Sequence, residues 1–499
     1  MKISWSAPTS NGTTVSGYSV TRATTVSGTY TNATGCSNLG VVLTCTATGL
    51  TNGTTYYFKV AASSAEGTGP YSSASLSAVP SEPMILTVDT SKVASNLFSL
   101  PLSGTVNVAV DWGDNSATQT TRSSGLLQHT YATDDIFTVK IYGALSQYGS
   151  SSLSHSNGSP LLTGVSSWGT LGLTSLNSAF YSAQNLTVVP SYIPANVTDL
   201  GYMFVGASSF NQNINLWDTS RVTNMTWMFH VALQFNQSLN LWNTSNVTSM
   251  SHMFWYAYAF NQNIDNWNVS NVTTMESMFS RATSFNNGCA SGVTTCPLNS
   301  WNTSKVTNMS WMFYISPFNQ DVSSWNTSRL TYMRYMFEEA RQFNQNIGGW
   351  DTSKVVSMEG VFQNANAFNQ NIGGWNTSLV ESMHKMFRGA FVFNQNIGSW
   401  NTSRVTNMER MFESAYRFDQ NIGDWNISSV TTFHLFLSSA TDFSNANYSL
   451  LLSGWASRPV KPNLTFAVGT KKYSASSATA RAVLTSSPNN WNITDGGQE

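Results

Sequence analysis

Tryptophan recurs at a nearly constant interval through the second half of the chain. The steps between successive members of the series are 25 residues, apart from one of 34 and one of 24. The series is Trp217, Trp242, Trp267, Trp301, Trp325, Trp350, Trp375, Trp400 and Trp425. A fixed period of this length is typical of stacked repeats, in which each unit leaves an apolar face open until its neighbour covers it. The sequence therefore predicts a solenoid for this part of the chain.

Each unit has two halves with different patterns, and it reads approximately F-N-Q-x-I-x-x-W-[ND]-T-S-x-V-T-x-M-x-x-M-F-x-x-A-x-x. In the second half apolar residues recur at three- and four-residue steps, which predicts a short helix with Ser353 as the N-cap in one unit. The apolar residues of that unit are Val355, Met358, Phe362 and Ala365. The first half, residues 343–347 followed by two glycines, predicts a short strand and a turn. The expected fold is an α/β solenoid of the leucine-rich-repeat kind, with units of about 25 residues.

The recurring large apolar side chains are assigned to the core of the stack. Each contributes roughly 1.5–3 kcal/mol when it is buried, so contacts between units are expected to dominate stability. Polar amides such as Asn369 and Gln370 follow the phenylalanine of each unit. We expect them to line up on successive units and to bond backbone groups of the next turn, which is a structural role and not a ligand site.

Domain boundaries follow from where the repeat begins and ends. Residues 1–80 and 84–145 show short alternating runs separated by Thr, Ser and Gly turns, which predict two small all-β sandwiches of the Ig-like kind. An N-terminal cap with degenerate repeats is expected over residues 160–204, regular repeats over 205–440, and a C-terminal cap containing a helix over 441–499. The terminal units of a solenoid must differ from the others because their outer face meets water.

The four cysteines form two close pairs, Cys36 with Cys45 and Cys289 with Cys296. Neither pair has the C-x-x-C spacing of a zinc or redox site, so we expect two disulfides and an oxidising compartment, with free buried thiols as the alternative. The second pair lies within the 34-residue step, whose nine extra residues are predicted to project as a contact loop. The opening residues lack the apolar core of a secretion signal, so we expect the chain to be part of a longer secreted protein.

Charged residues are scarce and balanced along the chain. Lys plus Arg number 23 and Asp plus Glu number 24, together 9% of the residues, which excludes the basic footprint of a nucleic-acid-binding protein. No window reaches the roughly 18 apolar residues of a membrane-spanning helix. The motifs of metalloproteases, α/β-hydrolases, P-loop NTPases and EF-hands are missing from the sequence. We therefore expect no catalytic residue, no metal and no cofactor.

One column of the repeat lies off the apolar stripe, two residues after the first methionine of each unit. Along this column the residues change from aromatic in the early units to basic in the later ones. We expect the column to form a row on the outer surface, where exposed aromatic residues are typical of glycan sites and protein hot spots. Packing between domains is the alternative. The candidate ligand contacts in and beside the column are Trp227, His230, His252, Trp255, Tyr256, Tyr258, Trp311, Tyr314 and Tyr335.

Short motifs in the two β domains resemble known families. Residues 50–56, together with Trp5, resemble a fibronectin type III domain with Tyr56 at the tyrosine corner. That resemblance implies that the first strand of the family is missing before Trp5. Residues 111–114 and 129–131 resemble the paired-strand motifs of a polycystic-kidney-disease-type (PKD) domain. The carboxylates of the first of these motifs are assigned to a turn and not to calcium.

The repeat array, from about residue 165 to 497, is similar to the BspA-like leucine-rich-repeat surface proteins, whose units carry M-F-x-x-A-x-x-F-N-Q and W-[ND]-T-S-x-V-T-x-M. The resemblance implies an extracellular or cell-surface location and adhesion. We therefore expect a non-catalytic adhesin segment that binds a glycan or a protein on another cell or matrix through the array. The alternative is a self-assembling structural subunit of an extracellular filament or sheet.

Overall fold

The N-terminal domain is built from β-strands, as the sequence predicted. The computed structural model describes residues 1–9, 12–51, 54–75, 77–78, 80–150 and 160–499; Asn52 and Gly53 of the fibronectin-like motif lie outside the described residues. One sheet pairs β1 with β4, and the other has the order β3-β2-β5-β6. The strands are β1 (Lys2–Ser4), β2 (Gly17–Ala23), β3 (Thr31–Asn32), β4 (Thr44–Thr46), β5 (Tyr57–Ser64) and β6 (Gly67–Thr68).

Three features of this domain bear on the sequence predictions. The disulfide between Cys36 and Cys45 is present and lies in the core of the domain. The backbone N–H of Thr51 donates to the hydroxyl of Tyr56 at 3.1 Å, which is the bond expected of a tyrosine corner. A short strand, β1, lies directly before Trp5 and pairs with β4.

The second β domain is a single six-stranded sheet with the order β10-β8-β11-β7-β12, and β9 pairs with β8. Its elements are β7 (Met84–Asp89), the 3-10 turn η1 (Thr90–Lys92), β8 (Leu97–Asp111), β9 (Gln119–Thr121), β10 (Gly125–Thr130), β11 (Ile136–Tyr148) and β12 (Leu162–Trp168). The sequence predicted a separate sandwich ending near residue 145. Instead, the sheet also includes β12, which lies in the segment that was assigned to the N-terminal cap of the array. Gly164 on this strand forms a parallel bridge to Val188, so the sheet continues into the first coils.

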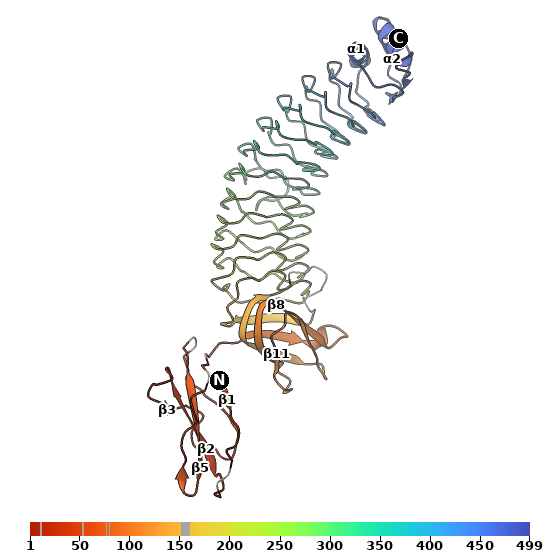
Figure 1. Cartoon of the computed structure of the whole chain (residues 1–499). Coiled ribbons are helices and arrows are strands. Elements are labelled where there is room, and N and C mark those ends of the chain that lie inside the picture. The colour runs from red at the N-terminus through yellow and green to blue at the C-terminus, as the bar shows by residue number, and fades with distance from the viewer. Residues whose placement is uncertain (10–11, 52–53, 76, 79, 151–159) are drawn as a thin grey trace.

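The repeat array is a stack of coils joined by single-residue bridges. Every residue between β12 and α1 is described, and none lies in a helix or a multi-residue strand. Figure 1 shows a curved stack of coils between the second sheet and the C-terminal helices. The predicted α/β unit is therefore wrong in both halves: residues 343–347 form no strand, and no helix follows Ser353. The bridged residues are Ser175, Asp199, Asn224, Ser249, Thr274, Asn308, Tyr332, Ser357, Ser382, Asn407 and Thr432.

Turns with left-handed residues take the place of the predicted helix. The N–H of Met228 donates to the carbonyl of Met225, three residues back, whereas a helix would reach four residues back. Trp227 and Val231 have φ angles of 61° and 57°, which interrupt any right-handed helix. The N–H of Phe229 donates to the next coil. This chain of turns keeps the three- and four-residue spacing of apolar side chains, which is why the pattern suggested a helix.

Aromatic columns run through the middle of the stack. The rings of Phe229 and Phe254, from successive coils, stack at 5.4 Å, and those of Trp217 and Trp242 at 6.4 Å. The indole N–H of each repeat tryptophan donates to a carbonyl of the preceding coil, for example from Trp375 at 3.0 Å. One contiguous core extends from the second sheet through all the coils to the C-terminal segment. The assignment of these columns to the core is confirmed.

The amides that follow the repeat phenylalanine form the predicted ladder. The side-chain oxygen of Asn344 accepts from the backbone N–H of Asn369 at 3.0 Å and from Nε2 of Gln370 at 2.9 Å. The backbone contact recurs from coil to coil. We call the series the asparagine ladder: Asn211, Asn236, Asn261, Asn286, Asn319, Asn344, Asn369, Asn394, Asp419 and Ser444. It satisfies backbone N–H groups that would otherwise lack an acceptor.

Both ends of the stack are covered. At the N-terminal end Trp168 of the second sheet packs on Phe180 of the first coil, with ring centroids 5.9 Å apart. At the C-terminal end Trp455 and Trp491 pack on Phe433 at 4.9 and 5.7 Å. Two helices thus lie where the sequence predicted a cap with one. The covering elements are α1 (Asn445–Ala456), β13 (Thr465–Ala467), η2 (Ala475–Ser477), α2 (Ala478–Thr485) and β14 (Asn492–Thr494).

Candidate binding surface

The outward column identified in the sequence coincides with a left-handed backbone position. All nine members, from Trp227 to Leu435, have φ between 53° and 61°. The aromatic members are partly exposed, and each is partly covered by neighbours in the row. Tyr202, in the degenerate unit before the row, has the same conformation and stacks on Trp227 at 5.7 Å. Aligning that unit on the repeat methionines would have found Tyr202 from the sequence.

Seven rings from three coils form one cluster, which we call the aromatic patch: Tyr202, Trp227, His230, His252, Trp255, Tyr256 and Tyr258. The ring of Trp227 lies between those of Tyr202 and His252, which stack at 5.7 and 4.5 Å, and Trp255 meets it edge-on at 5.1 Å. Both faces of Trp227 are therefore covered, and its remaining exposure is at the ring edges. The structure brings six of the nine predicted contacts into this patch.

The other three predicted contacts lie on the following coils. Trp311 stacks on Tyr335 with ring centroids 5.4 Å apart. Tyr314 joins the aromatic patch through Arg281, whose guanidinium lies 5.2 Å from the ring of Tyr256 and 5.1 Å from that of Tyr314. Sequence reasoning missed Arg281, because no column of the repeat marks it as different from other surface cations.

The indole N–H groups divide the tryptophans into two classes. Each repeat tryptophan of the core donates to a backbone carbonyl, for example Trp350 at 3.2 Å. Those of Trp227, Trp255 and Trp311 have no hydrogen-bond partner among the described residues, and none of the three is a buried polar atom. These three nitrogens are therefore not fully buried.

Both histidines of the aromatic patch make a hydrogen bond through Nδ1. Nδ1 of His230 lies 3.0 Å from the carbonyl of Trp255, so it carries the proton. Nδ1 of His252 lies 2.9 Å from the hydroxyl of Ser251, which also lies 3.3 Å from the carbonyl of Glu276. Burial lowers the pKa of both rings to about 4; at His230 the bond to the carbonyl opposes this shift, and at His252 the charge of His230 adds to it. The rings are neutral at pH 7, and Nε2 of His230 is an acceptor.

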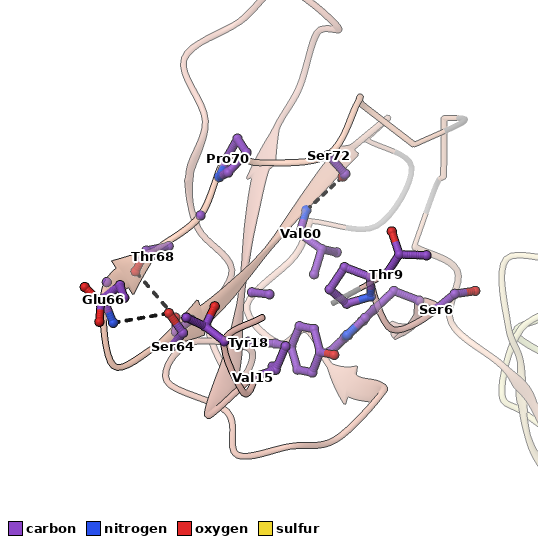
Figure 2. A pocket seen from close by; sticks show the side chains of 17 residues that line it. Ser6, Thr9, Val15, Tyr18, Val60, Ser64, Glu66, Thr68, Pro70 and Ser72 are labelled. Atoms are coloured by element: carbon purple, nitrogen blue, oxygen red, sulfur yellow. Dashed lines mark hydrogen bonds between the residues drawn. The ribbon is translucent and has the colours of Figure 1, made fainter. Parts of the chain in front are cut away.

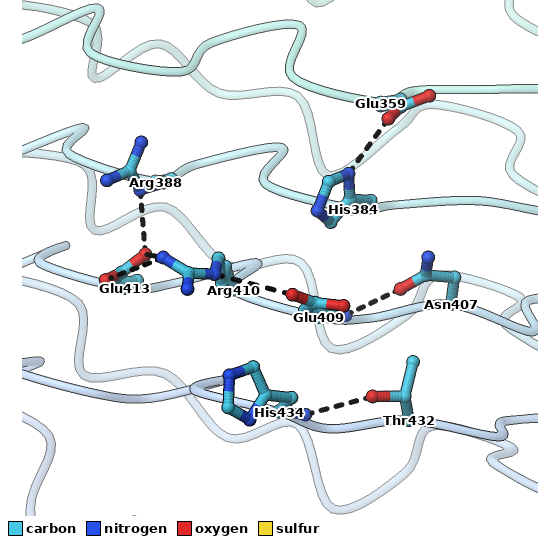
Figure 3. A network of polar contacts seen from close by, with 9 residues as sticks. All are labelled: Glu359, His384, Arg388, Asn407, Glu409, Arg410, Glu413, Thr432 and His434. Atoms are coloured by element: carbon cyan, nitrogen blue, oxygen red, sulfur yellow. Dashed lines mark hydrogen bonds and ion pairs between the residues drawn. The ribbon is translucent and has the colours of Figure 1, made fainter.

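The later coils carry paired charges on the same face (Figure 3). Burial raises the pKa of the Glu359 carboxyl, but hydrogen bonds from Tyr335 and His384 bring it below its ordinary value. The basic residues that the sequence predicted for the later units are therefore paired with carboxylates of the same coils or of neighbouring ones. The contacts are Glu359 with His384 at 2.9 Å, Arg388 with Glu413 at 2.7 Å, and Arg410 with Glu413 at 3.2 Å and Glu409 at 3.4 Å.

The disulfide between Cys289 and Cys296 is present, but its loop folds along the stack. The amide of Asn286 donates to two carbonyls of the loop, at 2.7 and 3.0 Å. Gln342, two coils further on, donates to the hydroxyl of Ser291 at 2.7 Å. The loop is therefore tied to the asparagine ladder and to a later coil, whereas the sequence predicted a projecting contact loop.

A groove of about 680 Å³ in the N-terminal domain was not anticipated from the sequence (Figure 2). It lies beside Trp5, Tyr18 and Val60, and Glu66 is the only charged side chain among the described residues of its lining. The indole N–H of Trp5 is buried without a partner among the described residues.

No group of three or more His, Cys, Asp or Glu side chains is placed to hold a metal ion in the part of the chain that the structure describes. In the same residues, no helix has the length and apolar character needed to cross a membrane.

Comparison with known proteins places most of the coils in one family. The family model described as "Mycoplasma protein of unknown function, DUF285" matches residues 174–292, 289–390 and 370–461. These matches span more than half of the 499 residues. The chain belongs to the DUF285 family. The aromatic patch and the paired charges of the later coils both lie within the DUF285 matches.

The other match concerns the first domain. The fibronectin type III model matches residues 1–77, which confirms that resemblance. No curated protein and no solved structure matches the chain. The two family matches therefore identify repeats and a domain, while the description of DUF285 itself gives no function.

Proposed function

We propose that this DUF285 protein is a non-catalytic surface protein whose repeat array binds a partner, as an adhesin does. The observation that carries the proposal is the aromatic patch, in which rings from three coils hold one another in place. Rigid clusters of Trp, Tyr and Arg are typical of binding hot spots, because they offer contact area at little cost in conformational entropy. Side chains fixed before binding lose less freedom when a partner arrives.

Two observations favour the extracellular location that this proposal requires. Both cysteine pairs are disulfides, and disulfides persist in oxidising compartments. A fibronectin type III domain is typical of extracellular proteins. We further propose that the coils are related to the BspA-like surface proteins, whose unit motifs they carry.

We also propose that the second sheet is related to PKD-type domains. The ring of His129 stacks on Trp112 at 4.7 Å, and its Nε2 lies 2.7 Å from the carboxylate of Asp114. The hydroxyl of Tyr131 donates to the carbonyl of Trp112 at 3.0 Å. The carboxylate of Asp111 accepts from the backbone of the turn at 3.0 Å, which supports a turn role for this motif. The paired motifs thus hold two strands together in a spacer domain.

Self-assembly into a filament or sheet is the second candidate function. The covered ends of the stack disfavour end-to-end growth, because no apolar coil is left open there. Leu216 and Leu241, on adjacent coils, are 76% and 63% exposed, which favours a lateral contact between arrays. Sedimentation over a range of concentrations distinguishes the two candidates.

The proposal is tested by binding of the whole chain to immobilised matrix proteins and glycans. We expect saturable binding that falls at least about tenfold in the Trp227→Ala/Trp311→Ala variant, since hot-spot truncation costs 2 kcal/mol or more. Phe391→Ala, which removes a 36%-exposed ring elsewhere on the array, is the matched control. Circular dichroism verifies that each variant is folded. Absence of binding together with self-association at rising concentration would favour the structural subunit.

A further inference from the structure

The aromatic patch offers a ligand hydrogen-bonding groups more than open ring faces. Because Trp227 is stacked on both sides, the accessible part of its ring is the edge. The indole N–H groups of Trp227 and Trp255 are donors without partners among the described residues. Nε2 of His230 is an acceptor, because Nδ1 of that ring already donates to a carbonyl. Donors and acceptors therefore lie together within one cluster of rings.

The charged groups beside the aromatic patch are engaged with other side chains. The guanidinium of Arg281 is held between the rings of Tyr256 and Tyr314 and donates to the hydroxyl of Tyr314 at 3.2 Å. The carboxylate of Glu276 accepts from the amide of Asn308 at 3.1 Å. The carboxylate of Asp199, whose charge acts on Tyr202, accepts from the amide of Asn224 at 2.8 Å. Because these groups already have partners, an ionic ligand would gain little there.

We infer that the aromatic patch binds an uncharged saccharide chain. This inference rests on the proposed function and narrows its ligand. A sugar hydroxyl both donates and accepts, so it can accept from an indole N–H while it donates to a histidine Nε2. The C–H faces of a sugar also pack well against aromatic surfaces such as Tyr258, which is 42% exposed.

The spacing of the coils suits a linear chain of sugars. Rings at equivalent positions of adjacent coils lie 5.7 Å apart for Tyr202 and Trp227 and 4.5 Å apart for Trp227 and His252. This separation is comparable to the length of one hexose unit. A chain lying along the axis of the stack would therefore present about one sugar to each coil of the patch, in keeping with the repeating contacts of solenoid surfaces.

The test uses the whole chain and an array of neutral hexose and N-acetylhexosamine oligomers, printed beside the same chains carrying sialic acid or sulfate. The strongest neutral oligomer is then titrated by calorimetry against the parent and the Trp227→Phe/Trp255→Phe variant. Phenylalanine keeps a ring but removes the N–H, and each lost hydrogen bond should weaken binding about threefold to tenfold. Tyr416→Phe, which removes a hydroxyl from an exposed ring outside the patch, is the control.

We expect saturable binding to neutral oligomers, a loss of at least about tenfold in the double variant, and no change in the control. An equal affinity of parent and double variant, or binding only to the acidic chains, would overturn the inference. Binding of a matrix protein through Trp227 and Trp311, without binding of any neutral oligomer, would also overturn the inference. That result would leave the proposed function intact. Melting curves verify that the variants are folded. His230→Phe is a second probe, because it keeps a ring and removes the Nε2 acceptor, and it should weaken binding about threefold to tenfold.

Discussion

Removing one amide from the asparagine ladder tests how adjacent coils are held together. The side-chain oxygen of Asn344 accepts from the backbone N–H of Asn369 and from Nε2 of Gln370, and both contacts are partly buried. In Asn344→Ala both donors lose this acceptor, although Gln370 keeps a 3.1 Å bond to the carbonyl of residue 344. A buried donor left without a partner costs roughly 1–3 kcal/mol, and the N–H of Asn369 is the one donor so affected; we therefore expect a destabilisation of about 1–3 kcal/mol.

The matched control is Asn344→Asp, which keeps an oxygen at the accepting position. The chain itself uses an aspartate on the ladder, since Asp419 accepts from the backbone N–H of Ser444 at 2.8 Å. The amide nitrogen of Asn344 makes no hydrogen bond among the described residues, so its loss removes no contact. We therefore expect Asn344→Asp to lose less than about 1 kcal/mol.

The assay combines urea unfolding with hydrogen exchange at the amide of Asn369. Repeat arrays unfold in segments, so the exchange rate at this single amide reports the local contact more directly than a global midpoint does. We expect faster exchange at Asn369 in the alanine variant and near-parent exchange in the aspartate variant. A change below about 0.5 kcal/mol in the alanine variant, or an equal loss in both variants, would refute the acceptor argument.

Three further outcomes are expected. His230 and His252 should titrate near pH 4 by NMR. Because the pKa of each ring is lower in the folded than in the unfolded protein, the free energy of unfolding falls as the pH drops from about 6.5 to 4. The loss should be about 1–2 kcal/mol for each histidine after allowing for partial exposure. Gly360→Ala should lower the free energy of unfolding by about 1–3 kcal/mol, because the added Cβ would lie 2.1 Å from the Tyr335 ring. Thermal melts should show that adding Tyr335→Ala to this variant relieves much of the loss. Trp375→Phe should cost about 1–3 kcal/mol in urea unfolding, because the indole bond to the preceding coil is lost.

The sequence by itself determined the period of the stack and the residues of its core. Met358 and Phe362 recur in register with their counterparts, and both are fully buried. It also determined the role of Asn369 and Gln370, because a polar amide repeated beside a buried phenylalanine must find backbone partners. The disulfide pairs were predicted from the spacing and surroundings of the cysteines, with free thiols as the alternative, and both are present. These features depend on composition and interval, which a linear sequence carries in full.

Only the tertiary structure decided the backbone within each unit and the form of the surface. Apolar residues at three- and four-residue steps suit a helix and a chain of turns equally, and the choice depends on hydrogen bonds to the next coil, as at Phe229. The closure of both faces of Trp227, and the bond from Nδ1 of His230 to the carbonyl of Trp255, likewise depend on partners about 25 residues away. No local pattern encodes such contacts, because each is made between coils that meet only after the chain has stacked.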